Sequence, residues 1–240
     1  MLDKLRSVYR RQMFLPGIFA IFFNPFYFAR KNLSSAILEY SNNVSGNLVD
    51  IGCGTKPYRS LFRVESYRGL DIDSPETRCR GVAEDLYDGK KFPYQDGVFD
   101  SALCNQVLEH VFNPNEFLSE IHRVLKPGGN LLLTVPFVWD EHEQPFDYAR
   151  YSSFGLSALL EKNRFKIISH KKLGADATIL FQLINAYLFK ISQNWPKFGR
   201  LLFTIIVIAS VNLFGIIAGR LLPKNPDLFL DHVVLAEKVP

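Results

Sequence analysis

A short buried strand that runs straight into a glycine turn constrains this 240-residue chain more than any other feature. The segment VDIGCG, residues 49–54, ends in Gly52 and Gly54, where the missing Cβ lets the backbone approach a ligand closely. Asp71 ends the next strand candidate, and a carboxylate there can accept both hydroxyls of a ribose. The pattern predicts an α/β sheet with a nucleoside site at the carboxyl ends of its first two strands.

Strand and helix patterns alternate along the rest of the chain, which is typical of a parallel sheet whose crossovers are helices. One helix is expected where Asn113, Pro114 and Glu116 supply a cap, a first-turn proline and a capping-box acid. Another is expected to start at Ser34 or Ser35, ahead of AILEY. A third fits residues 153–163, and the strand candidates are NLVDI at 47–51, YRGLDI near 70, RCRGV near 80, FDSALC at 99–104, NLLLTV at 130–135, FKIISHK at 165–171 and DHVVLAEK at 231–238.

The choice of cofactor depends on a glycine that the turn lacks. A dinucleotide fingerprint has a third glycine where this chain has Pro57, because a pyrophosphate needs a bare helix N-terminus close by. Lys56 and Pro57 disfavour a diphosphate, whereas S-adenosylmethionine carries no phosphate and tolerates a bulkier turn. We therefore predict S-adenosylmethionine, with an NAD-dependent nucleotide-sugar oxidoreductase as a weaker alternative.

Four segments together resemble class I methyltransferases of the methyltransferase-11 type. They are VDIGCG, GLDID, EDLYDGKKFPYQDGVFDSALCNQVLEHV, and the loop LKPGG before NLLLTVPF. The resemblance covers about residues 45–172 and the terminal strand. It implies a Rossmann-like α/β fold: a seven-stranded sheet, parallel but for one reversed strand, with helices on both faces.

The resemblance also implies which residues contact S-adenosylmethionine. Position 56 is Lys where many members of the family have a third glycine, so the path of the loop stays open. The acid at position 85 is also consistent with a turn residue. The matched positions are Asp50, Gly52, Cys53 and Gly54 for the methionine part, Asp71 and Ile72 for the ribose and the flank of the adenine, Asp85 and Leu86 for the adenine ring, and Asn105 and Gln106 beside the sulfonium.

A polar segment, PFVWDEHEQPFDYARYS, follows the strand candidate at 130–135 and would lie at the edge where open α/β proteins bind ligands. Methyl transfer to a hydroxyl needs positioning and a base. His142 is the candidate base and Asp147 a second candidate catalytic residue, although a loop histidine bonded to the backbone fits equally well. Glu109 and His110 would lie near the cofactor in this fold or would merely pack there. No metal site is expected.

Two apolar segments, at 177–192 and 201–219, interrupt the pattern before the last strand candidate. The second carries no charge and would form roughly 28 Å of helix, close to the thickness of a bilayer core. A single crossing would separate the last strand from its sheet, so we favour a helical hairpin in or on one leaflet. Gly215 and Gly219 would let its helices approach closely. A dimer interface and a lid over the active site also fit.

The first 31 residues combine basic residues, Lys4 and Arg6 among them, with an apolar run broken by Pro16 and Pro25. An interfacial anchor and a cap packed on the domain surface fit this stretch equally well. The expected order is an anchor at 1–31, a methyltransferase domain at 32–175, an apolar hairpin at 176–227 and a final strand at 228–240.

A net charge of +4 suits an anionic membrane surface and is too small for a typical nucleic-acid binder. Three widely spaced cysteines indicate neither a disulfide framework nor a zinc knuckle. The predicted function is an S-adenosylmethionine-dependent methyltransferase at the cytoplasmic face of a membrane. Its acceptor would be a hydroxyl-bearing or lipid-linked small molecule, such as a glycan precursor, a quinone-like compound or a polar lipid. The alternative function is a non-catalytic cofactor-binding module at a membrane. A homodimer could form through the hairpin.

Overall fold

The computed structural model describes residues 2–240. Met1, the first residue of the predicted anchor, lies outside the described residues, as do the side chains of residues 2–5, including Lys4. The chain forms two compact units. The sheet unit comprises Ile37–Phe137, Glu141–Lys171 and His232–Pro240, and the helical unit comprises the chain up to Ala36, Val138–Asp140 and Lys172–Asp231.

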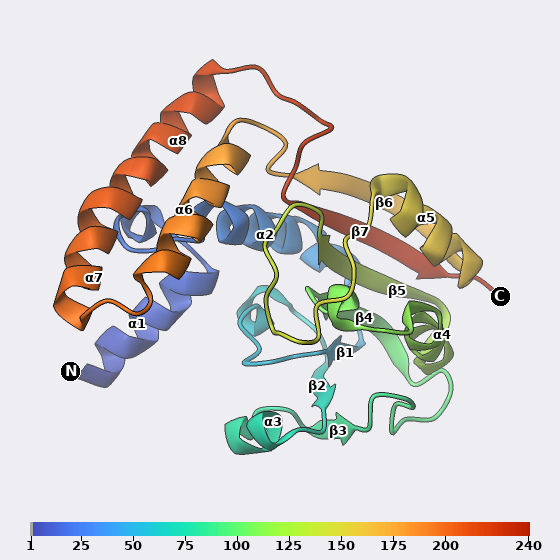
Figure 1. Cartoon of the computed structure of the whole chain (residues 1–240). Helices are drawn as coiled ribbons and strands as arrows, with labels where there is room; N and C mark the ends of the chain where they lie inside the picture. Colours follow the sequence, from blue (N-terminus) through green and yellow to red (C-terminus); the bar gives the residue numbers. More distant parts are fainter. Residues whose placement is uncertain (1) are drawn as a thin grey trace. The chain divides into compact units, whose positions relative to one another are not determined.

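The seven strands form one mixed sheet in the order β3-β2-β1-β4-β5-β7-β6 (Figure 1). The first five strands pair in parallel, whereas β7 runs antiparallel between β5 and β6. The predicted sheet, parallel but for one reversed strand, is confirmed. The strands are β1 (Asn47–Ile51), β2 (Ser66–Ile72), β3 (Asp85–Tyr87), β4 (Phe99–Asn105), β5 (Leu125–Pro136), β6 (Phe165–Leu173) and β7 (Asp231–Lys238).

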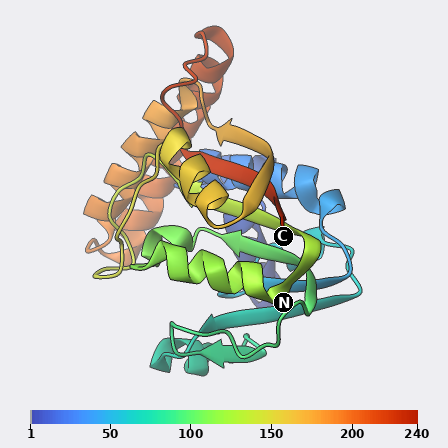
Figure 2. The same ribbon diagram turned by 90° about the vertical axis from the view of Figure 1, so that its right-hand side faces the viewer.

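The core of the sheet unit lies between the central strands and two amphipathic helices. Helices α4 (Pro114–Val124) and α5 (Ser153–Lys162) cover the face of the sheet turned toward the viewer in Figure 2. Leu118 of α4 and Leu156 of α5 are fully buried in the same apolar cluster as Leu131 of β5. Because the central strands are apolar on both faces, polar side chains concentrate where strands end.

The strand expected at RCRGV is wrong, because these residues end helix α3 (Pro75–Arg80). Ser74 caps the helix by accepting a hydrogen bond from the Thr77 amide, and Pro75 occupies its first turn. Gly81, at φ +58°, closes it in the left-handed conformation. Signals at both helix ends therefore outweigh the weak strand pattern, and the third strand follows at β3.

Two predicted caps are also corrected. Helix α2 (Tyr27–Tyr40) starts well before Ser34 and Ser35, and the Ser34 hydroxyl donates to the Lys31 carbonyl within the helix. Helix α4 begins at Pro114 as predicted, but the Asn113 side chain makes no capping hydrogen bond. Directly before α2, the side-chain oxygen of Asn24 accepts the Phe26 amide at 2.8 Å.

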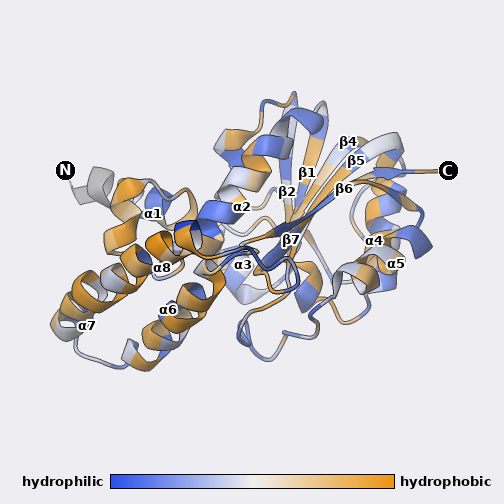
Figure 3. Ribbon diagram, turned by 90° about the horizontal axis from the view of Figure 1, so that it is seen from above, coloured by the Kyte–Doolittle hydropathy of each residue, from blue (hydrophilic) through white to orange (hydrophobic). Residues whose placement is uncertain are grey.

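The helical unit contains the two apolar segments that the sequence predicted as helices. Its elements are α1 (Leu2–Phe14), the 3₁₀ turn η1 (Ile18–Phe22), the first part of α2, α6 (Thr178–Ser192), α7 (Lys197–Phe203), the π-helical η5 (Thr204–Ile208) and α8 (Ala209–Leu221). The stretch Lys197–Leu221 is one helix of 25 residues that contains an 18-residue window with a mean hydropathy of 2.6, so by length and composition it could cross a membrane. Most of α6, α7 and α8 is hydrophobic (Figure 3).

Close helix contacts in the helical unit depend on two glycines. A Cβ on Gly215 would lie 2.8 Å from the Cβ of Phe181 on α6, and one on Gly219 would lie 2.6 Å from Cγ2 of Thr178. Contacts this short do not occur between real side chains, so α8 approaches α6 only because these positions are glycine.

Candidate active site

Two glycines in the left-handed conformation form the turn after β1. Gly52 has φ +68° and Gly54 φ +53°, and the amides of Gly52 and Cys53 donate to the Leu70 carbonyl at 2.8 and 3.2 Å. A Cβ on Gly52 would lie 2.4 Å from Val107, whereas one on Gly54 would meet nothing closer than 3.7 Å. The turn is therefore tightly packed on one side and open at Gly54.

Asp71 joins the ends of β1 and β2. Its side chain is 8% exposed, and its two carboxylate oxygens accept the amides of Gly54 at 3.1 Å and Ile72 at 2.8 Å. Leu86 of β3 pairs directly with Asp71 across the ladder. The structure thus brings Gly54, Asp71, Ile72 and Leu86 together at one edge of the sheet.

Asp50 lies beneath this turn and is almost fully buried. Its carboxyl group accepts a hydrogen bond from the Tyr67 hydroxyl at 2.5 Å. Burial raises the pKa of Asp50 to about 7, although the Tyr67 hydrogen bond favours the ionised form. Burial also raises the pKa of Cys53 to about 12, so that this cysteine is a protonated thiol at neutral pH. No motif in the sequence indicated this role of Tyr67.

Lys56 explains how the turn continues without a third glycine. It adopts φ 52°, and its ammonium group pairs with the Glu84 carboxylate, which in turn accepts the Gly69 amide at 2.6 Å. A Cβ on Gly69 would lie 2.3 Å from Cε of Lys56. The lysine side chain therefore runs over β2, and the path of the loop that the sequence left open is defined.

Asn105 and Gln106 end β4, next to the turn, because Cys104 pairs with Ile51 of β1. The side-chain oxygen Oδ1 of Asn105 accepts from the Thr134 hydroxyl at 2.8 Å, and the side-chain nitrogen Nε2 of Gln106 donates to the same hydroxyl at 3.3 Å. Both predicted residues are fixed by β5 at the same edge as Asp71.

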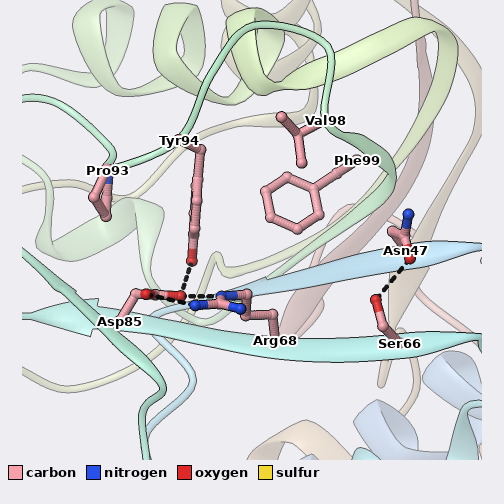
Figure 4. A pocket seen from close by; sticks show the side chains of 8 residues that line it. All are labelled: Asn47, Ser66, Arg68, Asp85, Pro93, Tyr94, Val98 and Phe99. Atoms are coloured by element: carbon pink, nitrogen blue, oxygen red, sulfur yellow. Dashed lines mark hydrogen bonds and ion pairs between the residues drawn. The ribbon is translucent and has the colours of Figure 1, made fainter.

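Asp85 has different surroundings from those that the resemblance implied. Its carboxylate pairs with Arg68 and accepts the Tyr94 hydroxyl at 2.8 Å, and the Arg68 hydrogen bond lowers the pKa of Asp85 (Figure 4). No hydrogen bond described in residues 2–240 joins it to the glycine turn. It lines a cavity of about 260 Å³ together with Asn47, Ser66, Arg68, Pro93, Tyr94, Val98 and Phe99, two of which begin β1 and β2.

The two predicted catalytic residues lie together in the polar loop. The Asp147 carboxylate accepts the His142 amide at 3.0 Å and two hydrogen bonds from Arg150, at 2.5 and 2.7 Å. Arg150 lowers the pKa of Asp147 to about 2, so the group is ionised at neutral pH. Nδ1 of His142 lies 3.3 Å from this carboxylate. Asp147 thus orients the imidazole ring, with Nε2 directed away from it.

Glu109 and His110, whose role the sequence left open, attach this loop to the end of β4. They lie in the short turn η4 (Leu108–His110), and the Glu109 carbonyl accepts the amides of Tyr148 and Ala149. The Glu109 side chain is fully buried, with Oε1 at 3.7 Å from Nε2 of His110 and 4.0 Å from Nε2 of His142. The loop and the end of β4 therefore form one continuous polar edge.

Comparison with known families decides what kind of site this is. A family model described as a methyltransferase domain matches residues 26–171, more than half of the chain. The chain belongs to this methyltransferase family. The predicted S-adenosylmethionine-dependent methyltransferase is confirmed, although the matching model is that of type 23 and the motifs suggested type 11.

Curated relatives of the methyltransferase are distant. An uncharacterised protein of Methanocaldococcus jannaschii is 26% identical over 164 residues, which cover 64% of this chain and 78% of that protein. The ubiquinone biosynthesis O-methyltransferase of Pseudomonas aeruginosa is 30% identical over 102 residues, covering 42% of this chain and 38% of the enzyme. The methyltransferase therefore spans well under half of that enzyme's length.

Among solved structures, the phosphoethanolamine N-methyltransferase 2 of Haemonchus contortus shares the fold. It was solved with phosphomonomethylethanolamine and S-adenosylhomocysteine. The TM-score is 0.57 at 17% identity, and the match covers 98% of the methyltransferase and 57% of that protein. This likeness supports the fold of the chain.

The residues at the strand ends fit an adenosyl group carrying a methionine part. The open side of Gly54 leaves space that a Cβ would enter, and the buried Asp71 carboxylate supplies charged acceptor oxygens beside it. Such an acceptor suits neighbouring ribose hydroxyls.

Proposed function

We propose that the methyltransferase methylates a hydroxyl-bearing or lipid-linked small molecule at the cytoplasmic face of a membrane. The observation that carries this proposal is the distribution of side chains in the helical unit. Its exposed positions include Phe198 at 73%, Phe214 at 64%, Ile217 at 52% and Leu221 at 77% exposure. Amphipathic or apolar helices of this kind bind the interface between lipid headgroups and acyl chains.

The buried positions of the same unit support the proposal. Gln182, Asn185 and Asn212 are fully buried, and Asn212 accepts from the Asn185 amide at 2.8 Å. Gln182 accepts the amides of Phe28 and Ala29. Helices in an apolar environment are joined by such interhelical hydrogen bonds, because burial in protein is the alternative to exposure to hydrocarbon.

In the proposed reaction the glycine turn would hold the methionine part of the donor and Asp71 its ribose. When bound, S-adenosylmethionine supplies a methyl carbon that accepts an electron pair from the acceptor while the carbon–sulfur pair passes to sulfur. Asn105 and Gln106 would lie beside this centre. His142 stays the predicted catalytic residue on the acceptor side, and Asp147, which acts through His142, is a positioning residue.

The acceptor class is tested by methyl transfer. The full chain is incubated with methyl-labelled S-adenosylmethionine and with either the lipid phase or the aqueous phase of a cell extract. The proposal predicts label in a lipid-phase product, and His142→Ala is expected to lose this labelling while keeping affinity for S-adenosylhomocysteine. Labelling of water-soluble compounds alone contradicts the lipid-linked acceptor, and cofactor binding without transfer to either phase favours the non-catalytic module.

Membrane association is tested by flotation with vesicles of phosphatidylcholine and phosphatidylglycerol. A variant carrying Phe198→Gln, Phe214→Gln and Ile217→Gln is expected to lose most of the vesicle-bound fraction, because each buried apolar side chain contributes about 1.5–3 kcal/mol. The matched control is Phe154→Gln, which changes a phenylalanine of α5 that is 88% exposed. A triple variant that floats like the wild type contradicts the proposal.

A further inference from the structure

Three potential metal ligands of the sheet unit converge on one point of the acceptor loop. Oε1 of Glu109, Nε2 of His110 and Nε2 of His142 all lie within 4.8 Å of one another. The two distances to the carboxylate oxygen are 3.7 and 4.0 Å. Ligand atoms about 2.1 Å from one zinc ion in tetrahedral geometry are about 3.4 Å apart, so the two distances to Glu109 would shorten by about 0.3 and 0.6 Å when an ion binds.

The imidazole of His110 is held in the orientation that a ligand needs. Its Nδ1 lies 2.8 Å from the Phe146 carbonyl oxygen, which can only accept, so Nδ1 carries the proton. Nε2 of the neutral ring is therefore the atom with a lone pair, and it is this atom that faces Glu109. Metal-binding histidines characteristically donate their second nitrogen to a carbonyl or carboxylate.

His142 repeats this arrangement with a carboxylate in place of the carbonyl. Its Nδ1 lies 3.3 Å from Asp147, which Arg150 fixes through two hydrogen bonds. Nε2 of His142 lies 4.0 Å from Oε1 of the same Glu109 carboxylate. Two histidines thus have their Nδ1 atoms held and their Nε2 atoms directed at the same carboxylate, which is the support that a metal site requires.

The three side chains of the cluster differ in their exposure to solvent. Glu109 is 0% exposed, whereas the side chains of His110 and His142 are 19% and 29% exposed. A buried carboxylate and two histidines leave coordination positions on the solvent side. Two histidines and a glutamate with an open position form a known zinc ligand set, and imidazole and carboxylate ligands also suit other first-row divalent metals.

We infer that Glu109, His110 and His142 bind a divalent transition metal, of which zinc is the best fit, at the acceptor side of the active site. Resting on the proposed function, the ion would hold the acceptor hydroxyl at its open position and increase the acidity of that hydroxyl. The hydroxyl proton passes to water, the oxygen pair forms the bond to the methyl carbon, and the carbon–sulfur pair stays on sulfur. With the ion bound, His142 is a ligand instead of a base.

Metal titration of the full chain tests this inference. The protein is stripped with EDTA, dialysed and titrated with Zn²⁺ against a chromophoric chelator, and Co²⁺ is added separately to record the visible absorption of the bound ion. We expect one ion per chain, and at least about tenfold weaker binding in each of Glu109→Gln, His110→Ala and His142→Ala, with altered Co²⁺ spectra.

The control is His170→Gln, which changes a histidine of β6 that is hydrogen-bonded to His232. It is expected to leave Zn²⁺ affinity unchanged. Wild-type protein that binds no more Zn²⁺ than a double variant of His110→Ala and His142→Ala overturns the inference, as does an equal loss in His170→Gln. Retained affinity for S-adenosylhomocysteine shows that each variant is folded. Because no acceptor is needed, this result is independent of the proposed substrate class.

Discussion

The two units of the chain differ in the polar side chains that they bury and the apolar side chains that they expose. In the sheet unit, Leu103, Leu118 and Leu133 are at most 1% exposed, and polar side chains gather at the ends of strands. In the helical unit, the fully buried residues include Asn185 and Asn212, whereas large apolar side chains are exposed on α7 and α8. The proposed membrane association rests on this difference.

This difference separates two parts of the function. In contact with lipid, burying apolar side chains between helices contributes little free energy, because lipid is equally apolar. Hydrogen bonds between buried amides then help to join the helices. The strand ends of the sheet unit supply the acids, amides and histidines that chemistry requires. We infer that the sheet unit determines the reaction and the helical unit determines where it takes place.

The largest expected effect is the loss of cofactor affinity in Asp71→Ala. A carboxylate that accepts two ribose hydroxyls contributes about 1.5–3 kcal/mol for each hydrogen bond, so the Kd for S-adenosylhomocysteine should rise at least about 100-fold. Calorimetry measures this change.

Asp73→Ala is the matched control, because Asp73 lies two residues further along and pairs with Arg78 at the surface. The glutamine variants of the helical unit should also leave the Kd unchanged. A loss of affinity in those variants comparable to that of Asp71→Ala would break the division between the two units.

The second prediction concerns the pH dependence of stability in the sheet unit. Burial raises the pKa of Asp50 to about 7 in the folded state, above its ordinary value in the unfolded chain. The folded state binds this proton more tightly, so the stability that Asp50 contributes is fully present below about pH 4 and is lost as pH rises to about 7. At 1.36 kcal/mol per pKa unit the decline is about 4 kcal/mol, and Asp50→Asn should abolish it.

Urea unfolding at pH 5 and pH 8 measures the difference between wild type and variant. Asp100→Asn is the control, because the hydrogen bond from Lys126 lowers the pKa of Asp100 and this carboxylate stays ionised at both pH values. Its contribution to stability is present at neutral pH and is lost as pH falls through the folded pKa. If wild type and Asp50→Asn lose stability in parallel between these pH values, the buried carboxyl is not the cause.

The third prediction concerns a buried amide of the helical unit. Asn212 donates to the carbonyls of Ile21 at 2.8 Å and Asn24 at 3.1 Å, and accepts from Asn185. Asn212→Leu leaves these partners buried without hydrogen bonds and should lower the stability by about 2–4 kcal/mol, measured by thermal unfolding in mild detergent. Asn194→Leu, at an exposed turn, is the control. Equal stability of the two variants would contradict the role of buried amides.

The smallest expected effect on stability comes from substituting the exposed apolar side chains of the helical unit. Phe214→Gln and Ile217→Gln should each change the stability of the isolated protein by less than about 0.5 kcal/mol, because neither side chain is part of the packed interior. Their effect should appear only when vesicles are present. A large loss of stability without lipid would indicate that these side chains are covered by protein.

Much of the fold was predictable because local patterns repeat along the chain. Each strand end that carries chemistry follows an apolar run, and the parallel register brings Ile51 beside both Leu70 and Cys104. This register explains why Asp71, Asn105 and Gln106 could be placed at one edge from their order in the sequence. The strand prediction at RCRGV failed because the helix begins at a cap outside the segment, Ser74, and Gly81 within the segment ends it in the left-handed conformation.

The partners of the site residues were not predictable, because they depend on side-chain directions across the sheet. The hydrogen bond from Tyr67 to Asp50 and the ion pair of Lys56 with Glu84 join residues 17 and 28 positions apart. The approach of His142 to Glu109 depends on the path of a loop that has no regular structure. His110 and His142 could be identified in the sequence, but their approach to one carboxylate could not be predicted from it.

Binding of the donor tests the central claim most directly. The purified full chain is titrated with S-adenosylmethionine, S-adenosylhomocysteine and NAD in a calorimeter, with its fold verified by circular dichroism. The account predicts one site per chain for the first two compounds and no heat of binding with NAD. A folded chain that binds neither S-adenosylmethionine nor its demethylated product would contradict it.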